Sequence, residues 1–305
     1  MYPKPERPKS GAPTAPIRLG LRPRTHTFDV LQSRPAPITQ AFTEQSVPAA
    51  YDRFMRRQLF EPWAGQLVAA ANLHAGQRIL DVASGTGVVA HAAAEIVGPT
   101  GAVTASDISR AMLELNRRRA RPNGLAPLDF VECSATALPF ADGSFGAVLC
   151  QHSLQFIPDR RTAAQEMRRV LGRGGVAAAS VWVTDRPHGL FTPVVETLAA
   201  EGLPEPFPGA FQWSRHCLSE TELSQAFSSA GFAETTIEVR SIVAVWADIA
   251  TATSAVQGMP FGPLLAALPE AQRERILDAI ASRLAQESDG TVHCETHALL
   301  ALGRT

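Results

Sequence analysis

Strand-like and helix-like segments alternate between residues 77 and 182, and this alternation limits the fold of the chain more than any other feature. Short apolar runs end in small or acidic residues, and an amphipathic stretch separates most of them from the next run. Such alternation predicts a parallel sheet with helices on both faces. The expected strands are 77–83, 102–107, 128–133, 145–152 and 174–182, and the expected helices are 88–97, 109–121 and 159–171.

Two further strands are expected near the carboxyl end of the chain. Residues 236–246 and 297–302 are apolar and rich in strand-forming types, and the amphipathic stretch 270–287 predicts a helix between them. These two strands suggest a hairpin that completes the sheet. The expected fold is therefore α/β, with a doubly wound, mostly parallel seven-stranded sheet and a helical lid insertion.

The segments outside the sheet have different compositions. Residues 1–40 contain eight prolines and carry seven Lys/Arg against two Asp/Glu, so we expect a disordered basic leader. An opening helix over 51–73 is expected to follow, and structure to begin near Val47. The folded domain is expected over 47–305, with lid or substrate insertions at about 184–222 and 247–292.

Charge, apolar runs and cysteines exclude several protein classes. The chain has a formal net charge of −1, so the part after the leader is acidic and gives no reason to expect a nucleic-acid partner. No apolar run reaches the roughly 18–20 residues that span a bilayer. The four cysteines form no C-x-x-C pair, which fits a reducing compartment. We therefore expect a soluble cytoplasmic protein with a small-molecule partner and an oligomeric state that stays open.

The stretch ILDVASGTGVVA, at 79–90, has the pattern of a nucleotide-binding loop between a strand and a helix. Gly85, Gly87 and Ala90 satisfy the dinucleotide pattern G-x-G-x-x-G/A. Asp107 follows Gly87 by 20 residues and could bind ribose hydroxyls of any adenosine-bearing cofactor. These residues alone leave a hydride-transfer enzyme and other adenosine-dependent enzymes open.

Asp81 separates these two chemistries. Its carboxylate ends the strand directly before the turn, where it would repel the pyrophosphate of a dinucleotide. The same carboxylate suits a ligand with an ammonium or sulfonium group. A cationic cofactor is therefore favoured.

Four motifs then occur in order at ordinary spacings: DVASGTG, ASD, SATALPFADGSFG and LGRGG. Together they resemble the class I S-adenosylmethionine-dependent methyltransferases, in particular the quinone-biosynthesis and small-molecule group. The resemblance covers residues 47–183 well and the final hairpin loosely. It implies a Rossmann-like fold with S-adenosylmethionine as cofactor.

The resemblance also implies roles for individual residues. The methionine end of the cofactor would lie beside the strand-end carboxylate, the loop and the end of the fourth strand. The ribose would meet the second strand end, the adenine would lie beyond it, and the opening helix would close over the cofactor. The strand-end carboxylate is Asp81, the loop residues are Ala83, Ser84, Gly85 and Gly87, and the residue at the end of the fourth strand is Gln151. The residue beside the ribose is Asp107, and those beside the adenine are Ile108, Ser134 and Ala135. The residue of the opening helix is Tyr51.

The chain departs from the family pattern at three positions. Ala83 replaces the first glycine of the loop, which matters only if its φ is positive. Ser134 replaces a usual aspartate and would accept from the adenine amino group without charge assistance. Gly146 replaces a further aspartate that we interpret as structural.

Candidate catalytic and lid residues come from the strand ends and insertions. His152 follows the fourth strand and is the best candidate for a general base, and His216 is a second. His293, Glu295 and His297 alternate along a strand, but we expect no metal, because such an edge is usually solvated. Aromatic residues gather in or beside the insertions and would enclose an apolar pocket: Phe191, Phe207, Phe211, Trp213, Trp246 and Phe261.

The sequence favours methyl transfer from S-adenosylmethionine to a small, apolar or aromatic acceptor by in-line displacement. Macromolecular acceptors fit poorly, because QHSLQF follows the fourth strand and no Pro-Cys pair occurs. An NAD(P)-dependent reductase stays open as an alternative, although the chain has two tyrosines and no Y-x-x-x-K pair. A non-catalytic cofactor-binding protein that recruits a partner is a second alternative. Methylation at oxygen, nitrogen and carbon all stay open.

Overall fold

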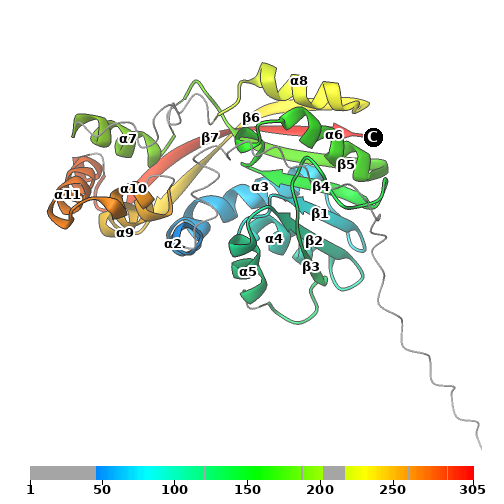
Figure 1. Ribbon diagram of the computed structural model, residues 1–305, viewed down its shortest axis with the longest axis horizontal. Coiled ribbons are helices and arrows are strands. Elements are labelled where there is room, and N and C mark those ends of the chain that lie inside the picture. The colour runs from blue at the N-terminus through cyan, green and yellow to red at the C-terminus, as the bar shows by residue number, and fades with distance from the viewer. Residues whose placement is uncertain (1–45, 120, 187, 202–216, 260–261, 287) are drawn as a thin grey trace, which may run out of the picture.

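The computed structural model describes residues 46–119, 121–186, 188–201, 217–259, 262–286 and 288–305, so the expected leader at 1–40 lies outside them. A seven-stranded sheet with the order β3-β2-β1-β4-β5-β7-β6 forms its centre (Figure 1). The pairs among β1 to β5 are parallel, and β7 runs antiparallel to both β5 and β6. The predicted α/β fold and its final hairpin are confirmed. The strands are β1 (Arg78–Val82), β2 (Ala102–Asp107), β3 (Leu128–Glu132), β4 (Phe145–Gln151), β5 (Leu171–Trp182), β6 (Glu234–Trp246) and β7 (Val292–Arg304).

Helices cover both faces of this sheet, which explains why its central strands are apolar throughout. Ile79 and Leu80 of β1 are both fully buried, although neighbouring side chains of a strand point to opposite faces. Helices α3 (Glu61–Ala71) and α4 (Val88–Val97) contribute to the core on one face. Helices α6 (Arg160–Val170) and α8 (Glu220–Ala230) contribute to the core on the other. Helix α5 (Arg110–Arg118) packs against β2 and β3.

The opening helix is interrupted, whereas the sequence predicted one helix over 51–73. Helix α2 (Ser46–Phe54) gives way to a π-helical turn, η1 (Arg56–Phe60), before α3 begins. The carbonyl of Met55 accepts from the N–H groups of both Leu59, at 2.9 Å, and Phe60, at 3.3 Å. The wider turn brings both of these side chains into the core, which a straight helix would space differently.

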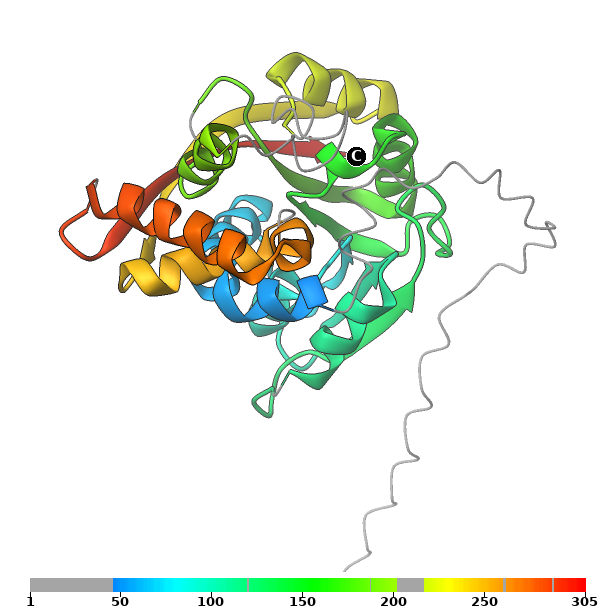
Figure 2. The ribbon, with the colours of Figure 1, turned by 60° about the vertical axis from the view of Figure 1, so that its left-hand side comes forward.

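A group of helices lies beyond the parallel strands, where β6 and β7 extend past them (Figures 1 and 2). Helix α7 (Phe191–Ala200) falls in the region 184–222, where the sequence predicted a lid or substrate insertion. Pro193 is its third residue, a position whose N–H has no partner within a helix, so the proline is tolerated. Helices α9 (Ile249–Ala255), α10 (Gly262–Ala267) and α11 (Glu270–Gln286) lie between β6 and β7, with a short 3-10 turn η4 (Val256–Gly258). Their role as a lid stays a prediction.

Across the described ranges, no helix combines the length and the apolar character needed to cross a membrane.

Candidate functional site

Two carboxylates lie together at the carboxyl edge of the sheet. Strands β1 and β2 run parallel, with Asp81 opposite Ala105, so that both strand ends reach the same edge. Asp107, at the end of β2, accepts from the backbone N–H of Gly85 at 2.8 Å through one oxygen. Its other oxygen accepts from the N–H of Ser109 at 2.7 Å. Asp107 thus fixes the glycine loop while each of its oxygens keeps capacity for a further hydrogen bond.

The two loop glycines serve different purposes. Gly87 has φ +89, and a Cβ there would lie 2.2 Å from the side chain of Asn116 in α5. It therefore permits close packing at the start of α4. Gly85 has φ +54, and a Cβ there would meet no atom within 4 Å of the described residues. The surface above Gly85 is thus open to a ligand that approaches the backbone.

Ala83 adopts the left-handed conformation that the sequence analysis named as the condition for strain, with φ +52. An alanine in this conformation costs roughly 1–2 kcal/mol because its Cβ crowds the following carbonyl. The Ser153 hydroxyl donates to the Ala83 carbonyl at 3.3 Å, which ties this strained residue to the segment after β4.

Buried polar atoms without partners gather beside the loop. Asp81 is 1% exposed, and its Oδ2 has no hydrogen-bond partner among the described residues. Burial raises the pKa of this carboxyl well above its usual value, opposed by the backbone N–H of Ala90. Ser84 Oγ and Gln151 Oε1 are likewise buried and unpartnered within the described part of the chain. An ammonium group here would restore the charged carboxylate and satisfy these acceptors.

An apolar surface lies next to Asp107 on the other side. Ile108 is 58% exposed, more than any other large hydrophobic side chain of the described residues. The N–H of Cys133 donates to the Asp107 carbonyl at 3.0 Å, so the half-buried Ser134 and Ala135 start from the same edge. The Ser134 hydroxyl accepts from the Thr136 N–H at 3.2 Å and shares a second bond with its hydroxyl at 2.8 Å. Ser134 thus has less free hydrogen-bonding capacity than the sequence suggested.

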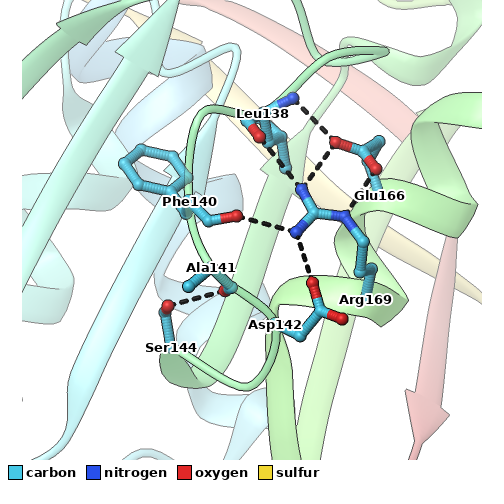
Figure 3. A network of polar contacts seen from close by, with 7 residues as sticks. All are labelled: Leu138, Phe140, Ala141, Asp142, Ser144, Glu166 and Arg169. Atoms are coloured by element: carbon cyan, nitrogen blue, oxygen red, sulfur yellow. Dashed lines mark hydrogen bonds and ion pairs between the residues drawn. The ribbon is translucent and has the colours of Figure 1, made fainter. Parts of the chain in front are cut away.

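The loop that follows Ser134 is held by one arginine of α6 (Figure 3). Arg169 donates to the carbonyls of Leu138, at 2.9 Å, and Phe140, at 2.7 Å. It also donates to Asp142 at 2.9 Å and forms a bidentate pair with Glu166 at 2.7 and 2.8 Å. Glu166 in turn accepts from the Leu138 N–H at 2.8 Å. This network explains the motif ALPFADGSF as a structural loop beside the site.

Tyr51 approaches the site from α2. Its ring stacks on Phe60 with centroids 4.4 Å apart and planes at 21°. Burial raises the pKa of the Tyr51 hydroxyl, and the charges of Asp52 and Asp107 raise it further. Tyr51 is followed by Asp52, which pairs with Arg119 beside the glycine loop.

His152 lies in an aromatic enclosure at the end of β4. Its ring stacks on Trp182 at 3.7 Å, and the Trp63 ring meets it edge-on at 5.4 Å. Both ring nitrogens are buried and lack hydrogen-bond partners in the described ranges. Burial lowers the pKa of this imidazole well below its usual value, and the nearby His188 lowers it further. The ring is therefore neutral, with one donor and one acceptor available to a bound molecule.

The remaining candidates make other contacts or lie outside the described residues. His293 and Glu295 are exposed on β7, and His297 Nδ1 bonds the Ser241 hydroxyl at 2.8 Å. No group of three potential metal ligands occurs among the described residues. Phe191 and Trp246 are buried in the core rather than lining an open pocket. His216 and four of the aromatic candidates lie outside the described residues: Phe207, Phe211, Trp213 and Phe261.

Sequence reasoning missed three residues of the site region. Trp182 ends β5 and could have been noticed as the carboxyl end of a parallel strand. Trp63 lies in α3 and gave no signal beyond helical periodicity. Arg119 follows α5, and its guanidinium donates to Asp52 of α2 and, at 3.5 Å, to Thr86 of the glycine loop.

Comparison with known families shows what this edge of the sheet belongs to. Residues 80–179, from β1 to β5, match the family described as "Methyltransferase domain". The matched segment includes both carboxylates, the glycine loop and the Arg169 network. Residues 80–179 are thus a methyltransferase domain.

Curated relatives of this methyltransferase domain include a ubiquinone/menaquinone biosynthesis C-methyltransferase, UbiE, from Xanthomonas campestris. That protein is 40% identical over 144 residues, which cover 46% of this chain and 56% of the relative. The chain thus matches just over half the length of its curated relatives.

Solved structures share the methyltransferase fold at lower identity. A phosphoethanolamine N-methyltransferase from Haemonchus contortus, in complex with S-adenosylhomocysteine, aligns with a TM-score of 0.55 at 17% identity. The alignment covers 88% of this chain and 59% of that one. The [4+2]-cyclase SpnF aligns with a TM-score of 0.56 at 17% identity, over 88% of this chain and 97% of that one. At this identity the likeness concerns the fold, which hosts more than one chemistry.

Proposed function

We propose that the protein transfers a methyl group from S-adenosylmethionine to a small, apolar or aromatic acceptor. The observation that carries this proposal is the unpartnered, buried Oδ2 of Asp81 beside a glycine loop anchored on Asp107. An anionic ligand would be repelled by the ionised form of that buried carboxyl, whereas an amino-acid ammonium would pair with it.

The residues present fit this cofactor along its length. Asp81 and Gln151 Oε1 would hold the ammonium. The open surface over Gly85 would let the methionine portion lie close to the backbone of the loop. Asp107 would accept from the ribose hydroxyls, and the exposed Ile108 would pack on the adenine. The bound cofactor supplies an electrophilic methyl group on a sulfonium.

The protein's part in the reaction is to align and enclose the reactants. Positioning of a nucleophile against an electrophile can supply about 7–11 kcal/mol of the barrier. The aromatic rings around His152 would exclude water from the acceptor. Because the pKa of His152 is lowered by burial, we assign this residue to accepting a hydrogen bond from the acceptor rather than to holding a proton at neutral pH.

The similarity to UbiE supports a finer proposal, that the acceptor is a quinone-type ring methylated at carbon. Such a ring is flat and apolar, and its hydroxyl could donate to the neutral His152 imidazole between Trp63 and Trp182. This acceptor class agrees with the lining of the enclosure.

Calorimetric titration with S-adenosylhomocysteine, S-adenosylmethionine and NADPH tests the proposed cofactor. We expect micromolar binding of the two sulfur compounds, no binding of NADPH, and loss of binding in Asp81→Asn with an unchanged melting temperature. Binding of NADPH instead would favour a reductase, and silence from all three would favour a non-catalytic fold. Transfer of radiolabel from S-adenosylmethionine to a demethylated quinol, with product analysis by mass spectrometry, then tests the acceptor.

A further inference from the structure

Helix α2 is attached to the glycine loop through a side chain that belongs to neither element. Arg119 follows α5, and its guanidinium forms an ion pair with Asp52 of α2. The same nitrogen lies 3.5 Å from the hydroxyl of Thr86, which is 2% exposed in the loop. The Arg119 side chain is 18% exposed and that of Asp52 is 30% exposed, so solvent screens this pair only partly.

This ion pair lies next to Tyr51, which the sequence analysis assigned to closing over the cofactor. Asp52 directly follows Tyr51, whose ring stacks on Phe60 with centroids 4.4 Å apart. On its other side α2 meets η4, where a Cβ on Gly258 would lie 2.8 Å from the Tyr51 Cα. The helix is therefore confined between η4 and α5, beside which it lies in both views (Figures 1 and 2). Arg119 joins α2 to the loop side through a polar contact with each.

Asp52 also meets a second cation, which provides a natural comparison. Arg56 Nε lies 3.4 Å from Asp52, one turn further along the same segment, and Arg56 also pairs with Glu61. Arg56 therefore adds charge to Asp52 without reaching α5 or the glycine loop. Removing Arg56 changes the charge around Asp52 but leaves the connection between α2 and α5 intact.

We propose that Arg119 is a positioning residue that latches α2 over the glycine loop and thereby sets how long the cofactor stays bound. The inference rests on the proposed cofactor. Because Arg119 touches both Asp52 and Thr86, closing α2 and ordering the loop become one linked event. By reciprocity, breaking the latch loosens α2 in the empty protein and speeds release of the bound cofactor.

Two measurements on Arg119→Gln, Asp52→Asn and the double variant test the latch. The first is amide hydrogen exchange of residues 46–54 in the ligand-free protein, and the second is the dissociation rate of S-adenosylhomocysteine by stopped flow. We expect each single variant to raise both rates on the order of tenfold, a usual size for coupling between linked elements. The double variant should add little to either single change, since both remove the same pair. Arg119→Lys, which keeps the cation, should recover part of the effect.

Matched controls separate the latch from general loss of stability. Arg56→Gln removes the other cation at Asp52, and Arg118→Gln removes an exposed neighbour of Arg119, and both should leave the two rates unchanged. Unchanged exchange and dissociation in Arg119→Gln, or additive effects in the double variant, would overturn the latch. If the wild-type chain binds no S-adenosylhomocysteine, the proposed cofactor fails, and the exchange measurement still decides whether Arg119 holds α2.

Discussion

The imidazole of His152 lies flat against the indole of Trp182, with ring centroids 3.7 Å apart and planes at 7°. The backbone of His152 is left-handed, with φ +48, and its N–H donates to the Ser180 carbonyl at 2.8 Å. A left-handed histidine persists only where its surroundings define it strongly. Strands β4 and β5 therefore hold this ring in one orientation at the edge where Asp81 and Asp107 lie.

The neutral state of His152 predicts a pH dependence of stability. Burial lowers the pKa of His152 below its usual value and that of His188 to about 4, so the unfolded chain binds more protons than the folded one below about pH 6.5. Above that pH these two histidines do not make the free energy of unfolding depend on pH. Below it, each histidine lowers the free energy of unfolding by up to about 1.4 kcal/mol per pH unit as the pH falls. Urea unfolding of His152→Phe should thus show a shallower decline between pH 6.5 and 4.5 than the wild type.

The exposed His74 offers a control for this measurement. His74→Gln should follow the wild-type curve, because the side chain at this position is exposed. A decline in His152→Phe as steep as that of the wild type would show that His152 is not buried in neutral form.

The raised pKa of Asp81 predicts that cofactor binding depends on pH. Burial raises this pKa in the empty protein, and a bound ammonium would lower it again. Binding should therefore release a proton and become tighter as the pH rises through the pKa of the empty protein. Calorimetric titration of S-adenosylhomocysteine in buffers of different ionisation enthalpy measures the released proton.

A ligand without the ammonium isolates this effect. Methylthioadenosine keeps the adenosine and the sulfur but lacks the amino-acid portion, so its affinity should not follow the Asp81 titration. The same pH profile for both ligands would place the ammonium elsewhere.

The fold and the position of Asp81 and Asp107 at one edge of the sheet were predictable because they depend on local pattern. Alternating apolar and amphipathic segments require a parallel sheet, and parallel strands bring Asp81 and Asp107 to one edge regardless of what lies between them. The strand-end position of Gln151 follows in the same way. Such features need only the chain's own periodicity.

Features that depend on contacts between distant segments were not predictable. The π-helical turn before Phe60 arises from packing of the opening helix on the core, and no motif announces it. Arg119 and Asp52 are 67 residues apart, and nothing in either segment distinguishes this pair from solvated surface charges. The stacking of His152 on Trp182 likewise depends on the register between β4 and β5.

The strain at Ala83 predicts a stabilising substitution within the site. Ala83→Gly removes the Cβ from a left-handed residue, which stabilises the folded state by roughly 1–2 kcal/mol. Glycine also gives the unfolded chain more conformational freedom, which offsets part of this gain. We expect a net gain of about 0.5–1 kcal/mol in the free energy of unfolding, measured by urea denaturation. A loss of stability would mean that the Ala83 methyl group makes packing contacts that outweigh the strain.

Arg169 predicts the largest loss of stability outside the core. Its guanidinium satisfies the carbonyls of Leu138 and Phe140 and pairs with Glu166, so Arg169→Ala leaves several partly buried acceptors without a donor. Hydrogen bonds to charged groups contribute about 1.5–3 kcal/mol each, and solvent can replace some of them, so we expect a loss of about 2–4 kcal/mol. Arg168→Ala is the matched control, because Arg168 makes a hydrogen bond of 3.3 Å to the Gly231 carbonyl and should change stability little. Since the loop 138–145 follows Ser134, Arg169→Ala should also weaken cofactor binding. Equal effects of Arg169→Ala and Arg168→Ala on urea unfolding would show that the network does not hold the loop.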